Sequence, residues 1–482
     1  MRVLLAPLFL IPAILYCQQP TVERAQSLLR EGKANEALSV LLELYKSDVS
    51  SPALCQQIGI AYTQLENLPK AEEFYRKAIQ LNPQFHAARK NLATVLWFLG
   101  RKDEAEREFL SVNKALAADP VPHLYLGLAE HGRRHFEGAK AHFQKAGTLA
   151  SANPEVLPTV LETYLATRDL SLPNQVMKKL ARAENPDPAL TSRTGAIFAQ
   201  YGYYDQAVIA FEKLVSARKD SAETWRMLAE AYDRQNKPDQ AYRAYARAIE
   251  MDPKSDDAYL ALAEFASAHH NDDFALDVVG RGLQHSPGAP GLLFERGILR
   301  ALKGDRDQAE NDFRQASQAK PDWNLPLLAI GVLKLESGNA AGAAATFEKS
   351  RAADPRDYRA HYLYAVAVSR DGGQNSDQKR ARALGALRRA IELNPNDART
   401  HALLGQLSLA AGDAGAAAIA WRKSLKIDPE NPTALYQLSL LYRKQGKTQE
   451  ADRMVQTFRQ LKAGKRDAEE SLVQILRVLP AK

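Results

Sequence analysis

The chain has 482 residues, of which 45% are hydrophobic and 25% are charged, a balance that is typical of a folded protein and argues against intrinsic disorder. The net charge is +7, from 64 basic and 57 acidic residues, and the two signs alternate along the chain. Interleaved charge indicates solvated helix faces and argues against the clustered basic stripe that binds nucleic acid.

Residues 1–20 have the pattern of a leader. Arg2 precedes an apolar run from Val3 to Tyr16 that contains two prolines, and this run is shorter than the roughly 20 residues that span a membrane. We therefore expect residues 1–17 to be a signal peptide, a secreted or periplasmic protein, and no membrane span in the mature chain. Two alternatives remain open: a lipid anchor at Cys17, which would give an outer-membrane-associated lipoprotein, and an uncleaved anchor or incorrect start.

Helical periodicity begins at Thr21 and is clearest between Ala222 and Pro253. There Trp225, Leu228, Ala229 and Tyr232 share one face of a first helix, and a second helix carries Ala241, Tyr245 and Ala248. Prolines that end such a pair recur 34 residues apart, at Pro253, Pro287, Pro321 and Pro355. A small residue on the first helix recurs with the same period, as Ala229, Ala263, Gly297, Gly331 and Ala365. A large side chain there would hold neighbouring helices apart, so the pattern predicts close helix packing.

This order of residues resembles the tetratricopeptide repeat (TPR) family, whose pattern is W-x2-L-G-x2-Y, then A-x3-F, then P. Ala229 in place of Gly and Tyr245 in place of Phe are the departures in the clearest unit. The resemblance implies an all-α, right-handed α-solenoid superhelix of about 13 helix-turn-helix units. We expect N-terminal units over 21–219, four regular 34-residue units over 220–357, and C-terminal units over 358–462.

Three stretches depart from the repeat. Leu172 and Pro173 stand where the second helix of the fifth unit should run, so that unit should be irregular near 170–185. Six additional residues, rich in Gly, Asn and Asp, predict an exposed loop insertion near 370–380. Residues 465–480 have the apolar spacing of an amphipathic helix, which suits a capping helix for the last unit, and their apolar positions are Leu472, Ile475, Leu476 and Leu479.

Catalytic motifs are absent from the sequence, which has no Gly-rich phosphate loop, G-x-S-x-G or H-E-x-x-H. The closest histidines, His131, His135 and His142, flank a turn and do not have the spacing of convergent metal ligands. Cys55 falls on an apolar helix position, which predicts a buried and inert thiol. We expect no catalytic residue, no cofactor and no metal, and therefore no enzyme.

In the TPR family the first helix of each unit lines a groove that binds peptides. By that register, an acidic groove would contain Glu223, Glu230, Asp233, Asp257 and Glu264. The following units would provide an apolar peptide-binding groove of Phe294, Ile298, Leu325, Leu328, Val332, Leu335, Tyr362 and Val366. The alternative is that some of these residues only pack between helices. Lys90 is followed one turn later by Thr94 instead of Asn, which argues against the family's clamp for C-terminal carboxylates.

These features favour a non-catalytic scaffold or adaptor that binds peptide segments or partner proteins in the bacterial cell envelope, with no nucleic-acid partner. An assembly factor for secretion, pili or polysaccharide export is the alternative. An enzyme or enzyme subunit is the least favoured function, because enzymes with TPR arrays join them to a catalytic domain. No segment outside the repeats is long enough to form one.

Overall fold

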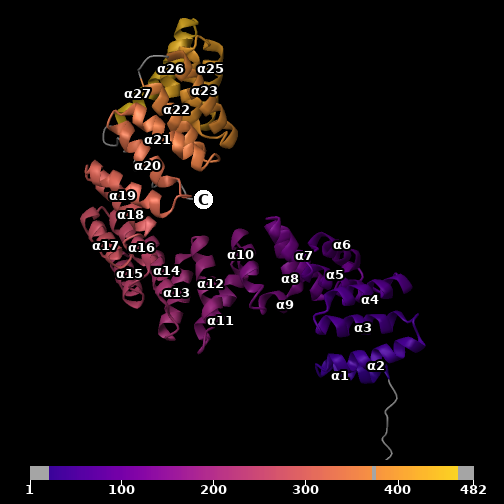
Figure 1. Ribbon diagram of the computed structural model, residues 1–482. Helices are drawn as coiled ribbons and strands as arrows, with labels where there is room; N and C mark the ends of the chain where they lie inside the picture. The colour runs from indigo at the N-terminus through magenta and orange to yellow at the C-terminus, as the bar shows by residue number, and fades with distance from the viewer. Residues whose placement is uncertain (1–20, 372–375, 465–482) are drawn as a thin grey trace, which may run out of the picture. The chain divides into compact units, whose positions relative to one another are not determined.

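The computed structural model describes residues 21–371 and 376–464, and within these ranges the chain forms 27 α-helices and no strand (Figure 1). The described chain falls into two compact parts, which meet in sequence between Asp220 and Ser221. We call them the N-terminal part and the C-terminal part. All helices except the four-residue α9 form 13 consecutive pairs of a first and a second helix, which confirms the predicted all-α repeat fold. The predicted leader and capping helix lie outside the described residues.

The N-terminal part contains the helices α1 (Val22–Arg30), α2 (Ala34–Ser47), α3 (Pro52–Gln64), α4 (Leu68–Leu81), α5 (His86–Phe98), α6 (Lys102–Asn113), α7 (Pro120–Gly132), α8 (Phe136–Ala146), α9 (Thr148–Ser151), α10 (Leu157–Ala166), α11 (Ser171–Arg182), α12 (Pro188–Gln200) and α13 (Tyr204–Ser216). The C-terminal part contains α14 (Ala222–Arg234), α15 (Pro238–Met251), α16 (Asp256–Ala268), α17 (Asp272–His285), α18 (Pro290–Leu302), α19 (Arg306–Ala319), α20 (Leu325–Glu336), α21 (Ala340–Ala353), α22 (Tyr358–Arg370), α23 (Ser376–Leu393), α24 (Ala398–Ala410), α25 (Ala414–Ile427), α26 (Pro432–Lys444) and α27 (Thr448–Gly464).

The turn inside each pair repeats with the same period as the sequence. One residue of the turn has a positive φ angle, and this position recurs 34 residues apart as Gly32, Glu66, Gly100, Arg134, Arg168, Gly202, Asn236, His270, Gly304 and Gly338. Glycine adopts this left-handed conformation without strain, whereas other residues adopt it less readily. The 34-residue period of the backbone therefore includes the first pair and the fifth pair.

Contact between the paired helices depends on a glycine and an aromatic ring 16 residues apart. In six pairs, a Cβ atom added to the glycine would overlap the ring: Gly59 with Tyr75, Gly127 with Phe143, Gly195 with Phe211, Gly297 with Phe313, Gly331 with Phe347, and Gly405 with Trp421. The absence of a side chain lets the ring fill the space between the two helices. This confirms the close packing that the recurring small residues predict.

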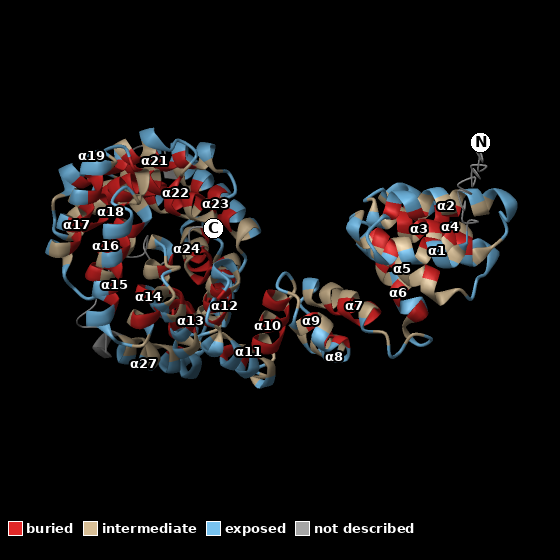
Figure 2. Ribbon diagram, turned by 90° about the horizontal axis from the view of Figure 1, so that it is seen from below, coloured by how far each residue is buried: buried red, intermediate tan, exposed pale blue. Residues whose placement is uncertain are grey.

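Buried residues lie where helices face one another, and exposed residues cover the outer surfaces of the helices (Figure 2). In the C-terminal part, first helices of successive pairs contact one another, as α14 does with α16 and α22 with α24. The second helices of successive described pairs in this part make no contact of similar extent. Elements lie closest on the inner side of a bend, so the first helices line the concave face of this part.

The fifth pair, which the sequence predicts to be irregular near 170–185, keeps a continuous second helix. α11 runs from Ser171 to Arg182, and Pro173 lies in its first turn, where the missing N–H has no intrahelical acceptor. The packing of this pair nevertheless differs from the others. Leu161 and Met177 occupy the places that glycine and an aromatic residue hold elsewhere, and α11 also packs against α13, another second helix.

Part of the predicted insertion near 370–380 is helix, whereas residues 372–375 lie outside the described residues. α22 continues to Arg370, and α23 begins at Ser376 and has 18 residues, against 14 for α21 and α25. The residues that follow Ser376 are good helix formers, including Lys379, Arg380 and Ala381. Part of the insertion therefore lengthens α23 at its N-terminus.

Candidate functional site

The predicted acidic residues lie on the concave side of α14 and α16. Glu223 and Glu230 have side chains that are 58% and 57% exposed, and Asp257 and Glu264 are exposed as well. Asp233 is partly buried, and its Oδ1 atom lies 2.8 Å from His269 Nε2. We call Glu223, Glu230, Asp233, Asp257 and Glu264 the acidic face.

One arginine neutralises part of the acidic face. Arg226 is 2.6 Å from Glu223 and 3.7 Å from Glu230. Behind these residues, burial raises the pKa of Tyr245 above its ordinary value, and the charges of Glu230, Asp233 and Glu264 add to the effect. Arg226 opposes this shift.

The predicted apolar groove is mostly helix core. Five of its eight residues are buried, namely Ile298, Leu325, Leu328, Val332 and Leu335, while Phe294, Tyr362 and Val366 are half-buried. The reason lies in α20, whose sequence is apolar around its whole circumference and which packs against α19, α21 and α22. The alternative of packing between helices thus holds for the five buried residues, and only the other three are available to a ligand.

Exposed apolar residues occur further along the same face. Leu409 on α24 is 39% exposed, and Tyr436 and Leu440 on α26 are 43% and 38% exposed. They occupy the repeat positions of Asp233, Arg226 and Glu230 respectively. The groove register that indicated Phe294 and Val366 could have found them, since they continue it into the last two pairs.

Histidines and basic residues elsewhere have partners within the chain. His131 Nδ1 lies 2.8 Å from Thr163 Oγ1, His135 Nδ1 lies 3.2 Å from a Glu130 carboxylate oxygen, and His142 contacts His123. These three histidines therefore face different groups. Lys90 donates to Asp119 at 2.6 Å, so its charge is already matched within the protein.

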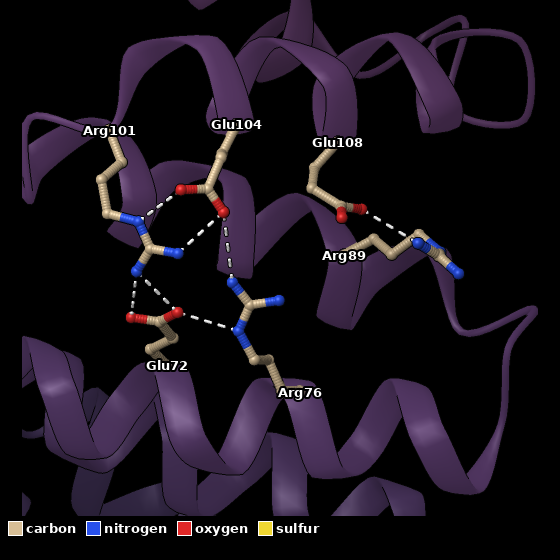
Figure 3. Close-up of polar contacts among 6 residues, drawn as sticks. All are labelled: Glu72, Arg76, Arg89, Arg101, Glu104 and Glu108. Carbon is tan, nitrogen blue, oxygen red and sulfur yellow. Dashed lines mark hydrogen bonds and ion pairs between the residues drawn. The ribbon is translucent and has the colours of Figure 1, made fainter.

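Much of the alternating charge forms ion pairs between helices, as Figure 3 shows for α4, α5 and α6. Arg101 is 2.8 Å from Glu72 and 2.6 Å from Glu104, and Arg76 also contacts both carboxylates. Exposed pairs of this kind contribute about 0–1 kcal/mol each. These ion pairs explain why the second helices carry charged residues, and no ligand is needed for that explanation.

Cys55 has no exposed surface and is a free thiol, as the sequence predicts. Burial raises its pKa, which keeps the thiol protonated and unreactive. Within residues 21–371 and 376–464, no helix combines the length and apolar character needed to cross a membrane.

Family models described as tetratricopeptide repeat match residues 52–85, 86–109, 222–265, 328–372, 377–432 and 420–453. The chain is a tetratricopeptide repeat protein. TPR proteins bind peptides or proteins, and their repeat arrays are generally scaffolds.

One curated relative of this TPR protein is the cellulose synthase operon protein C of Xanthomonas axonopodis pv. citri, which is 30% identical over 165 residues. The match covers 33% of this chain and 11% of that protein. The chain thus corresponds to a small fraction of the relative's length.

Solved structures similar to this TPR protein include the yeast Tom70, with 14% identity, a TM-score of 0.41, and coverage of 95% of this chain and 94% of that one. YrrB, described as a TPR protein with an unusual peptide-binding site, has 17% identity, a TM-score of 0.33, and coverage of 41% and 98%. MamA from Desulfovibrio magneticus RS-1 has 22% identity, a TM-score of 0.32, and coverage of 36% and 96%. None of these similarities indicates what this chain binds.

Proposed function

We propose that this TPR protein is a non-catalytic scaffold that binds an extended basic segment of a partner protein on the acidic face. The observation that carries the proposal is the set of five carboxylates on α14 and α16, where Arg226 contacts Glu223 and Glu230 and His269 contacts Asp233. A surface of one sign attracts a segment of the opposite sign and fixes its orientation.

The neighbouring surface supports an extended ligand. Phe294 on α18 and Tyr362 on α22 are half-buried, so they offer part of their rings to an apolar side chain of the same segment. Affinity in such sites comes from a few anchors, while charges set orientation and association rate. The proposed ligand therefore has lysine or arginine residues next to one or two apolar residues.

A fluorescence titration of the full chain with a labelled peptide of alternating lysine and leucine tests the proposal. The double variant Glu230→Gln, Glu264→Gln should weaken binding several-fold at low salt, and the effect should shrink as salt is added. Glu250→Gln is the matched control, because Glu250 is an exposed glutamate on the second helix α15, where it pairs with Arg247. Equal affinity of the double variant and the control would reject the acidic face as the site.

We also propose, as the location of this scaffold, the bacterial cell envelope, on the basis of the leader-like residues 1–17. A role in assembling polysaccharide export machinery is the second candidate within this location. The similarity of 165 residues to a cellulose synthase operon protein favours it over secretion or pilus assembly. N-terminal sequencing of the exported protein tests the location, since a mature chain that still begins at Met1 would exclude removal of a signal peptide.

A further inference from the structure

The fifth helix pair encloses a cavity that is separate from the acidic face. The cavity has a volume of about 260 Å³ and lies within the N-terminal part, between the end of α9, the start of α10, the second half of α11 and the first half of α12. Its wall is mainly apolar and includes Leu157, Val176, Leu180 and Leu190.

The cavity lies beside a helix pair that lacks the contact between a glycine and an aromatic ring. Where six other pairs have a glycine against an aromatic ring, this one has Leu161 and Met177. Pro173 and Met177 are the buried residues of α11, so Val176 and Leu180 are not fully covered by neighbouring helices. Half-covered aliphatic side chains gain stability when a ligand removes them from water.

The rim of the cavity is held in place by two lysines of the following pair. Lys213 Nζ donates to the carbonyl oxygen of Ala181 at 3.1 Å, and Lys219 Nζ donates to that of Pro186 at 2.9 Å. Asp187 caps α12 by accepting from the backbone N–H of Leu190 at 2.7 Å. The loop between α11 and α12 is therefore fixed, and the cavity is a formed feature of this pair.

The mouth of the cavity is basic. Lys179 lines the cavity and is exposed, and Lys178 and Arg182 lie beside it near the end of α11. Within the part of the chain that the structure describes, no carboxylate lies within ion-pair distance of Lys179. The acidic residue that lines the cavity, Asp187, is engaged with the backbone of α12. An ammonium group at the end of an apolar pocket matches a ligand with an anionic head and an aliphatic chain.

We propose that this cavity binds a short-chain aliphatic carboxylate, with the hydrocarbon chain among Leu157, Leu180 and Leu190 and the carboxylate at Lys179. The volume lies just below the roughly 300–1,000 Å³ of sites for drug-sized ligands, so the ligand is a small one of about eight carbons. The buried Thr191 and Thr194 also line the wall. The proposal is independent of the acidic face and its partner.

Isothermal titration of the full chain with octanoate, hexanoate, octylammonium and 1-octanol tests the proposal. Octanoate should bind at one saturable site about fifteenfold more tightly than hexanoate, because each of its two additional buried methylenes strengthens binding about fourfold. Octylammonium should bind more weakly than octanoate, since its charge has the sign of Lys179. The absence of saturable octanoate binding, or equal binding of octylammonium, would overturn the proposal.

Two variants place the ligand in the cavity. Lys179→Gln should weaken octanoate binding about threefold and leave 1-octanol binding unchanged, as expected for one exposed ion pair. Lys178→Gln is the matched control, because Lys178 is exposed on the same helix and does not line the cavity. Equal effects of the two substitutions would reject Lys179 as the carboxylate partner.

Ala152→Phe blocks the cavity from an exposed position at its edge, so the fold should persist, with circular dichroism as the check. This substitution should abolish octanoate binding. Unchanged binding would show that octanoate binds elsewhere and would reject the cavity as its site. A peptide with a C-terminal leucine provides a further distinction. If this peptide binds at the cavity and octanoate does not, the cavity recognises a protein end, and the proposal of an aliphatic carboxylate fails.

Discussion

The indole ring of Trp421 packs directly against the backbone of Gly405, in the space that a side chain at residue 405 would occupy. The ring is fully buried, and its Nε1 donates to the carbonyl oxygen of Ala402 at 3.1 Å. The glycine therefore sets both the distance between α24 and α25 and the hydrogen bond of the largest buried side chain.

Gly405→Ala should destabilise the C-terminal part by about 1–3 kcal/mol, because the added methyl group forces the indole ring or the helices to move. Urea unfolding followed by circular dichroism measures this. Gly385→Ala is the control, since a Cβ at this exposed position of α23 has no atom within 4 Å. The control should be stabilised by roughly 0.5–1 kcal/mol, as helix propensity predicts. A similar gain in the free energy of unfolding of both variants would show that the contact with Trp421 leaves room for a methyl group at residue 405.

Leu328→Glu should unfold the pairs around α20, because Leu328 has no exposed surface and a buried, unpaired carboxylate is costly. We expect a loss of roughly 3–5 kcal/mol, seen as reduced helix content and a lower melting temperature. Leu440→Glu, at a 38% exposed position on α26, should change stability by no more than about 0.5 kcal/mol. A folded Leu328→Glu protein with an unchanged melting temperature would show that Leu328 is not a core residue and is available to a ligand.

Asp312 joins two arginines inside the pair of α18 and α19. Its fully buried carboxylate accepts from Arg296 at 2.7 Å and from Arg300 at 2.6 Å. Asp312→Ala leaves two partly buried guanidinium groups without their anion and should cost about 3–5 kcal/mol in thermal or urea unfolding. Asp452→Ala, which removes an exposed pair with Arg443, should cost less than about 1 kcal/mol. Comparable losses would mean that burial does not distinguish the two ion pairs.

His123 and His142 should make stability depend on pH. Their Nδ1 atoms lie 3.0 Å apart, a contact that needs at least one neutral ring. Burial lowers the pKa of both from the ordinary 6.5, and the nearby Lys145 lowers each further, while Asp119 and Glu130 oppose the shift. The unfolded chain therefore binds more protons than the folded chain just below pH 6.5, and stability falls as the pH falls through that range.

The test compares melting temperatures at pH 7.5 and pH 5.5, which lie about one pH unit above and below the ordinary pKa of histidine. The wild-type chain should lose more stability on acidification than His142→Asn, which removes one of the two rings. His270→Asn is the control, because His270 is exposed in a turn. An identical pH dependence of wild type and His142→Asn would rule out the pair as its origin.

The sequence by itself determined the repeat. The 34-residue period predicts the helix pairs, and the spacing of Gly405 and Trp421 recurs in five other pairs. These features are local, because one turn and two adjacent helices decide them. The buried state of Cys55 followed from the same helical periodicity.

The tertiary structure decided which concave positions reach solvent. Glu230, Val332 and Leu440 share one repeat position, yet Glu230 and Leu440 are exposed and Val332 is buried. The difference arises from neighbouring helices, since α20 is surrounded by apolar surfaces on several sides, whereas α14 presents carboxylates to water. The cavity beside Lys179 likewise depends on how α11 is placed relative to α10, α12 and α13. Burial and cavities are properties of several packed elements together, so the pattern within one helix pair does not contain them.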